Sequence, residues 1–265
     1  MLRMLPDVPD GIGPISAKHS VTMADFPAGP DHVSKSIFWF GDFDPWVVRT
    51  MIRLTREGET VCDVGANIGD TALPLARRVG ATGRIYCFEP FPPNLVRLEN
   101  NIRANGFKQI SVVPIALSET AGRVRMVVPE NQPGMARVRL QGFESNVIHV
   151  ESIRFDDWIG ANNVSRICVV KLDVEGHELN VLRGMPKTLR ERLVEAFVLE
   201  YHGIFDPRHE WVALFTDNGY RILRICKGRG TSRFVDPQER SRGRATSDYV
   251  AVLKNSSAEK RLVEE

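Results

Sequence analysis

The chain has 265 residues, of which 43% are apolar and 26% are charged, and its formal net charge is +2. This length fits one large domain with or without appendages, and this composition excludes a disordered or low-complexity chain. The nearly balanced charge excludes a general electrostatic attraction to nucleic acid or membranes, and no apolar run approaches the roughly 18 residues that a membrane-spanning helix needs.

The N-terminal residues and the cysteines favour a cytoplasmic protein. The opening sequence MLRMLPDVPDG contains Pro6 and Pro9 and lacks the apolar stretch of a signal peptide. The cysteines lie in apolar, strand-like runs and show no CxxC spacing, so we interpret them as buried apolar side chains. We therefore expect neither disulfides nor a cysteine metal site at these four positions: Cys62, Cys87, Cys168 and Cys226.

Three segments divide the chain. Residues 1–36 are rich in Pro, Gly and Asp with little periodicity, so we predict an extended lead-in, partly ordered over the body of the protein, within an N-terminal extension, 1–43. The main domain is predicted over 44–255, and a polar tail over 256–265. A helix should begin near Asp44, because Pro45 occupies the first helical position.

Strands and helices then alternate, which is typical of a parallel sheet covered by helices on both faces. The predicted strands are 59–64, 83–89, 110–118, 166–174 and 195–202, and the helices are 70–79, 92–106, 177–193 and 210–219. Residues 122–128 and 145–153 alternate apolar and polar side chains and predict a β-rich insertion over the sheet. The last strands, 220–226 and 248–254, suggest an antiparallel edge hairpin, which gives a doubly wound α/β sheet of seven strands.

The loop after the first strand, VGANIG, indicates which cofactor such a sheet holds. A triphosphate loop needs a Gly-Lys-Ser/Thr ending, which this loop lacks. A dinucleotide loop needs GxGxxG, and here Ala66 and Asn67 would crowd a pyrophosphate. S-adenosylmethionine (SAM) has no pyrophosphate, and Asp63 can accept a hydrogen bond from its ammonium group. We expect a side chain at Gly65 to enter the space of the methionine moiety and to leave the fold intact.

Glu89 ends the second strand of the predicted sheet, where a carboxylate can accept hydrogen bonds from both ribose hydroxyls of SAM. The same carboxylate would repel the 2′-phosphate of NADP.

Two acidic segments follow the later strands. In KLDVEGHE, Lys171, Asp173 and Glu175 alternate and so share one direction, and His177 and Glu178 follow. In VLEYHG, Glu200 and His202 alternate at the end of the neighbouring strand. Because the carboxyl ends of parallel strands meet at one edge of the sheet, we expect a catalytic group there. Glu178 also suits a helix N-terminus for purely structural reasons.

The segments VCDVGANIGDTALPLA, CFEPFPPNLVRLENNI, ALSETAG and KLDVEGHELNVLRG together resemble the FkbM-type family of SAM-dependent methyltransferases. The resemblance runs from about residue 44 to residue 202. It implies a Rossmann-like class I methyltransferase fold and, usually, O-methylation of hydroxyls on secondary metabolites, glycolipids or sugars.

The resemblance also assigns roles. It implies that Asp63, Gly65, Asn67 and Gly69 form the cofactor loop, and that Glu89 binds the ribose. It places Ala116, Leu117 and Ser118 near the adenine and Asp173 beside the methyl-transfer centre.

Alternative functions stay open. The segment 227–244 is rich in basic residues; a solvated hairpin tip is the plainer interpretation, but the charge also suits RNA or another phosphorylated acceptor. An amino-methylating enzyme would need a Pro-Pro-aromatic motif after the fourth strand, and Val174-Glu175-Gly176 stands there. A third alternative is a protein that binds SAM without catalysis.

Two mechanisms fit the acidic edge. A side-chain base, His202, Glu175 or His177, takes the proton of the acceptor hydroxyl directly. Alternatively, Asp173 with Glu175 or Glu200 holds a divalent cation that lowers the pKa of that hydroxyl. The sequence commits to no metal ligand and to no oligomeric state.

Overall fold

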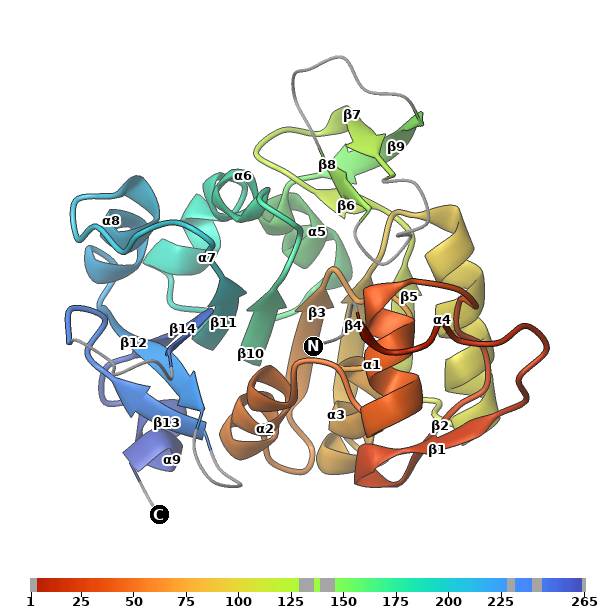
Figure 1. Ribbon diagram of the computed structural model, residues 1–265. Coiled ribbons are helices and arrows are strands. Elements are labelled where there is room, and N and C mark those ends of the chain that lie inside the picture. The colour runs from red at the N-terminus through yellow and green to blue at the C-terminus, as the bar shows by residue number, and fades with distance from the viewer. Residues whose placement is uncertain (1–3, 129–135, 139–145, 228–231, 240–244, 264–265) are drawn as a thin grey trace.

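The computed structural model describes residues 4–128, 136–138, 146–227, 232–239 and 245–263. Its centre is a mixed sheet in the order β13-β12-β14-β11-β10-β3-β4-β5 (Figure 1). Strands β11, β10, β3, β4 and β5 are parallel, and β14 is antiparallel to both β11 and β12. The bounds are β3 Thr60–Val64, β4 Arg84–Phe88, β5 Ile110–Val113, β10 Ile167–Leu172, β11 Val194–Glu200, β12 Tyr220–Lys227, β13 Ser232–Val235 and β14 Ala245–Leu253.

The doubly wound sheet and its antiparallel edge are therefore confirmed, but the count of seven strands is wrong. The eighth described strand, β13, lies within the basic segment 227–244 and pairs with β12. Residues 228–231 and 240–244 of that segment lie outside the described residues.

Helices cover both faces of the sheet. On one face, four helices bury side chains in one hydrophobic cluster: α2 Pro45–Leu54, α3 Ala72–Val79, α4 Pro92–Asn105 and α9 Ser257–Val263. On the other face, four helices share a second hydrophobic cluster: α5 Phe155–Asn162, α6 Glu178–Arg183, α7 Pro186–Arg190 and α8 Glu210–Thr216. Throughout the described ranges, none of the helices has the length and apolar character needed to span a membrane.

A second sheet stands above the carboxyl ends of the central strands, as Figure 1 shows. It has the order β6-β9-β7-β8, with β6 Ala116–Leu117, β7 Gly122–Val127, β8 Arg137–Val138 and β9 Val147–Ile153. The predicted β-rich insertion is therefore confirmed. The single strand predicted over 110–118 is wrong: it divides at Pro114, which has no N–H to continue a ladder, and β5 and β6 belong to different sheets.

One predicted helix needs correction, and two helices form where the sequence predicts none. The helix expected over 177–193 divides into α6 and α7. The division falls between Gly184 and Pro186. A Cβ at Gly184 would lie 2.1 Å from the Ser118 carbonyl oxygen, so a glycine is needed there, and Pro186 begins α7. Helix α5 lies in a region for which the sequence predicts no helix or strand. The predicted polar tail contains α9, whose Ala258 and Leu262 are buried in the cluster that also holds α2.

The N-terminal residues are ordered over the body of the protein, with more regular structure than the partly ordered, extended lead-in that the sequence predicts. We call residues 4–43 the N-terminal strap; it contains β1 Ile15–Ala17, η2 Lys18–Ser20, β2 Val21–Met23 and α1 His32–Phe40. The strap buries Val21, Met23, Val33 and Ile37 against Ile68 and Leu73, so it adds a third hydrophobic cluster.

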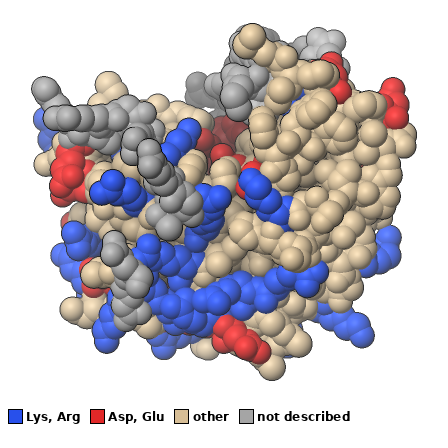
Figure 2. All heavy atoms as spheres, turned by 60° about the horizontal axis from the view of Figure 1, so that its bottom comes forward, with Lys and Arg blue, Asp and Glu red and all other residues tan. Residues whose placement is uncertain are grey.

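Arginines gather where α2 ends, on the face that Figure 2 brings forward. The guanidinium groups of Arg56, Arg78 and Arg261 donate to backbone carbonyls of residues 52–55. Arg261 also pairs with Glu59. Cations that bond the last carbonyls of a helix satisfy its unpaired acceptors and its dipole. This part of the positive surface therefore serves the stability of α2.

Candidate active site

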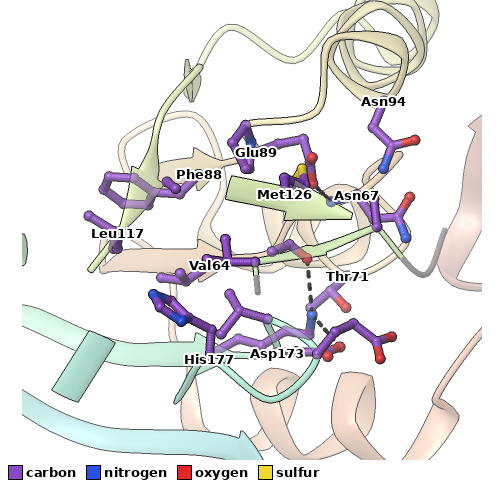
Figure 3. Close-up of a pocket in the computed structure, with 18 of the residues that line it drawn as sticks. Val64, Asn67, Thr71, Phe88, Glu89, Asn94, Leu117, Met126, Asp173 and His177 are labelled. Atoms are coloured by element: carbon purple, nitrogen blue, oxygen red, sulfur yellow. Dashed lines mark hydrogen bonds and ion pairs between the residues drawn. The ribbon is translucent and has the colours of Figure 1, made fainter. Parts of the chain in front are cut away.

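A pocket lies at the carboxyl ends of β3, β4 and β10, beneath the second sheet (Figure 3). Its empty volume is about 790 Å³, including the open space at its mouth. The loops after these strands form its floor. Met126 and Val138 of the second sheet close it from above, and Phe43 and Asp44 contribute from the strap side.

Three residues in the loop after β3 have a left-handed backbone conformation. Gly65 has φ +82°, Asn67 +50° and Gly69 +97°. A Cβ at Gly65 would lie 1.8 Å from the carbonyl oxygen of Asp173, and one at Gly69 would lie 2.9 Å from Leu98 Cδ1. The expectation that a side chain at Gly65 would enter cofactor space and spare the fold is therefore wrong. The glycine is needed because the loop after β10 approaches so closely.

Glu89 joins two of the loops. Its carboxylate accepts hydrogen bonds from the backbone N–H of Asn67 at 2.9 Å and of Phe91 at 2.8 Å. The side chain is nearly fully buried, and burial raises the pKa of Glu89 to about 7, against these two bonds. Each carboxylate oxygen keeps a further lone pair, so Glu89 both shapes the pocket and can accept a hydrogen bond from a ligand.

Asn94 is a pocket residue that the sequence interpretation missed. Its side chain is directed from α4 toward the pocket that Glu89 and Asn67 also line (Figure 3). The residue is 3% exposed, and its Oδ1 has no hydrogen-bond partner among the described residues. Buried polar atoms are normally paired, so an unpaired acceptor facing a pocket points to a ligand donor.

Lys171 holds the acidic edge together. Its Nζ lies 3.0 Å from Asp173 Oδ2 and 3.6 Å from Asp63 Oδ1, and it donates to the Gly65 carbonyl at 3.4 Å. Burial disfavours its charge, but Asp173 and Asp63 outweigh burial and raise the pKa of Lys171 well above its ordinary value. Asp63 is fully buried behind this ammonium group, so Gly65, Lys171 and Asp173 line the pocket in its place.

Two further carboxylates escaped the sequence interpretation. Asp70 and Asp44 both line the pocket. Burial, followed by the neighbouring carboxylates, raises the pKa of Asp44 to about 8, and burial raises that of Asp70 to about 7. The backbone of Asp44 also adopts a left-handed conformation, with φ +43°. The sequence pattern indicates only a helix start at this residue.

His177 lines the pocket as a neutral imidazole. It is 3% exposed, its Nε2 lies 3.1 Å from Ser118 Oγ, and burial lowers the pKa of His177 to about 4. Ala116 and Leu117 form the pocket wall, while Ser118 bonds this imidazole. A base with so low a pKa is a weak proton acceptor at neutral pH.

Glu175 occupies the centre of the loop after β10. It lines the pocket and has φ +55°, a backbone conformation that non-glycine residues adopt rarely and mostly at functional positions. Glu178 fixes this loop, because its Oε1 accepts hydrogen bonds from the backbone N–H of Val174 at 3.0 Å and of Gly176 at 3.1 Å. The motif thus combines one carboxylate that lines the pocket with one that holds the loop.

Glu200 and His202 lie together but beside the pocket. Glu200 accepts a hydrogen bond from Ser247 Oγ at 3.1 Å, and its Oε2 lies 3.3 Å from His202 Nε2, whose side chain is 64% exposed. Glu200 lines a neighbouring groove with Asp248, and Asp44 lines both this groove and the pocket. Burial and the charges of nearby carboxylates raise the pKa of Glu200 to about 8.

All four cysteines are free and buried, as predicted. Across the described part of the chain, no three His, Cys, Asp or Glu side chains are grouped as metal ligands.

Comparison with known proteins identifies a family. The model of the methyltransferase FkbM domain matches residues 63–222, more than half of the chain. A hexuronic acid methyltransferase of Haloferax volcanii is 32% identical over 166 residues, which cover 61% of this chain and 64% of the relative. A 2-O-methyltransferase of Sinorhizobium fredii is 26% identical over 156 residues, covering 51% of this chain and 61% of the relative. The chain thus matches somewhat less than two thirds of each relative's length.

Among solved structures, a SAM-dependent O-methyltransferase from Thermotoga maritima aligns with 86% of this chain and 74% of its own. The TM-score is 0.43 and the sequence identity 14%.

Proposed function

We propose that this chain, which belongs to the FkbM methyltransferase family, uses SAM to methylate a hydroxyl group of a sugar or another small hydroxylated molecule. The support for a sugar acceptor is that one relative is named a hexuronic acid methyltransferase and another a 2-O-methyltransferase. We further propose that it acts in the cytoplasm, in keeping with its four free cysteines.

The charge of the pocket carries the proposal. Five carboxyl groups line it, from Asp44, Asp70, Glu89, Asp173 and Glu175, against the single ammonium group of Lys171, so its formal charge is −4 when all are ionised (5 negative, 1 positive). Burial raises the pKa values of Asp44, Asp70 and Glu89 to about 8, 7 and 7, so these three groups are only partly ionised near neutral pH and a bound cation would favour their charged form. A pocket of this charge favours a cationic ligand. SAM carries a sulfonium and an ammonium group against one carboxylate, so its net charge is +1 and suits the site.

The pocket also offers suitable hydrogen-bond acceptors. Glu89 and Asn94 present carboxylate and amide oxygens on neighbouring walls, and the amide oxygen of Asn94 is unpaired within the described structure. Two hydroxyl groups of a ribose would supply the missing donors. Ala116, Leu117 and Phe88 form an apolar wall on which a base can pack.

The chemistry divides between ligand and protein. SAM supplies a methyl group on a positively charged sulfur, from which an oxygen nucleophile can displace it. The protein must orient the acceptor hydroxyl and remove its proton. We assign the base to Glu175, because it lines the pocket at the centre of the loop after β10, whereas the neighbouring His177 has a pKa of about 4. Glu200 then serves the acceptor side, along the groove that Asp44 shares, with His202 paired to it.

Calorimetry tests the cofactor. SAM and S-adenosylhomocysteine should bind the wild type, and Asn94→Ala should weaken both by about 1–3 kcal/mol, the value of a hydrogen bond in a closed site. Glu119→Ala, at a half-exposed carboxylate that pairs with Arg183, serves as the control and should bind normally. A folded wild-type protein that binds neither compound would contradict the proposal.

Methyl transfer tests the acceptor. Protein incubated with methyl-labelled SAM and soluble oligosaccharides, both neutral and uronic, should yield a methylated sugar by mass spectrometry. A parallel reaction with a chelator separates the side-chain base from a metal-assisted route. Binding of SAM with no methylated product from sugars, but with methylated RNA, would favour the phosphorylated acceptor.

A further inference from the structure

The N-terminal strap lies against the element that supports the cofactor loop. Strand β2 packs beside α4, and Figure 1 shows the strap crossing in front of α3 and α4. The end of the strap reaches the pocket itself, because Phe43 is one of the lining residues. The strap therefore contacts the candidate site both directly and through α4.

One side chain joins the strap to the loop. Asn101, on α4, is 0% exposed. Its Oδ1 accepts hydrogen bonds from the backbone N–H of Ala24 and of Asp25, each at 2.8 Å. Its Nδ2 donates to the carbonyls of Asp25 at 2.8 Å and of Ile68 at 2.9 Å. Two acceptor and two donor positions exhaust the capacity of an amide, so every bond of Asn101 is committed.

The Ile68 end of this connection belongs to the cofactor loop. Ile68 stands between Asn67, whose N–H is held by Glu89, and Gly69. Its side chain is 1% exposed and packs in the cluster that contains Val21 and Met23 of the strap. The loop is thus held from one side by Glu89 and from the other by the strap through Asn101.

A neighbouring asparagine offers a contrast. Asn105, one helical turn further along α4, accepts from Thr22 N–H at 2.8 Å and donates to the Thr22 carbonyl at 2.7 Å and to the Asn101 carbonyl at 2.8 Å. These bonds fasten the strap to α4 but do not reach the loop. The two side chains therefore separate strap anchoring from loop support.

We infer that Asn101 is a positioning residue that couples the docking of the strap to the shape of the cofactor loop, so that ligand binding and strap docking stabilise each other. The part concerning the ligand rests on the proposed function, since it takes the pocket to be a SAM site. If the strap favours the binding-competent loop, thermodynamic linkage requires that the ligand favour the docked strap by the same factor.

Hydrogen exchange of the ligand-free protein tests the coupling without reference to activity. Asn101→Ala should accelerate amide exchange in both the strap segment 22–25 and the loop segment 65–71, whereas Asn105→Ala should accelerate it only in the strap. Equal loop protection in Asn101→Ala and wild type, with a loosened strap, would overturn the inference. Loop exchange in Asn105→Ala that is as fast as loop exchange in Asn101→Ala would also overturn the inference.

Ligand binding supplies the second measurement. Asn101→Ala should weaken S-adenosylhomocysteine binding about 10-fold, within the usual range of coupling between sites, and Asn105→Ala by less than about 3-fold. In the wild type the same ligand should slow exchange at Thr22, Ala24 and Asp25, and unchanged exchange there would refute the coupling even if Asn101→Ala fails to fold. A wild type that binds no ligand would refute the proposed function, while the ligand-free exchange experiment would still decide the coupling.

Discussion

Replacing Lys171 with methionine should destabilise the protein strongly, because it leaves two carboxylates without their cation. The Nζ atom lies 3.0 Å from Asp173 and 3.6 Å from Asp63. At an effective dielectric constant of about 20 these distances correspond to roughly 5 kcal/mol of attraction each. Burying the ions offsets much of that gain. Removal of one partner from a buried pair typically costs about 3–5 kcal/mol, which is the loss we expect.

The pH dependence of the loss identifies its cause. Burial already raises the pKa of Asp63 to about 6, and the charge of Lys171 opposes that rise. Without Lys171 the folded-state pKa of Asp63 should rise further. A carboxyl whose pKa is raised on folding contributes stability at low pH that is lost as the pH passes the folded-state pKa. The unfolding free energy of Lys171→Met should therefore fall more steeply than that of the wild type between pH 5 and 8.

Urea unfolding followed by tryptophan fluorescence measures both effects, with Lys35→Met as the control. Lys35 is also buried, and its Nζ lies 3.0 Å from Asp7 Oδ1. The side chain of Asp7, however, is 58% exposed, so its carboxylate remains in water when the lysine is lost, at a cost of about 1 kcal/mol. Equal losses and equal pH slopes in the two variants would refute the argument about the acidic edge.

Three further predictions concern the same site. Glu175→Gln should keep SAM affinity within a few-fold and reduce turnover about 100-fold, as calorimetry and a methyl-transfer assay would measure; unchanged turnover with a lower melting temperature would make the carboxylate structural. Gly65→Ala should lower stability as well as SAM binding, because its Cβ would meet the Asp173 carbonyl at 1.8 Å, and a normal melting temperature would contradict the steric argument. Burial raises the pKa values of Asp70 and Glu89 to about 7, so the unfolding free energy of the wild type should fall as pH rises from about 5 to 8, and Asp70→Asn should flatten that dependence.

The sequence predicted those parts of the fold that depend on local pattern. The apolar run ending at Val64, the loop to Gly69 and the motif from Lys171 to Glu178 are local signals, and the structure brings these segments together at one pocket. The family prediction is likewise confirmed. In such a sheet, strand ends converge because parallel strands share one direction, so short motifs suffice to locate the site.

Features that depend on tertiary contacts escaped prediction. The sequence around Asn101 is that of an ordinary polar helix surface, and only the strap reveals that its amide is buried. Asn94 follows two prolines at a helix start and carries no motif of its own. The function of Gly65 was misjudged because the nearby backbone of Asp173 is more than a hundred residues away in sequence. Glu200 lies at the predicted edge of the sheet but lines the neighbouring groove, because alternation along a strand does not fix which cavity a side chain faces.

The position of β14 has a consequence for how the chain is made. β14 pairs with β11 on one side and with β12 on the other, and β12 pairs with β14 and β13. While the ribosome has synthesised the chain only as far as β12, β11 has an open edge of backbone donors and acceptors, and β12 cannot yet join the sheet. Open strand edges are sites of association between chains. The nascent protein should therefore remain vulnerable to aggregation, and dependent on chaperones, until residues 245–253 have emerged.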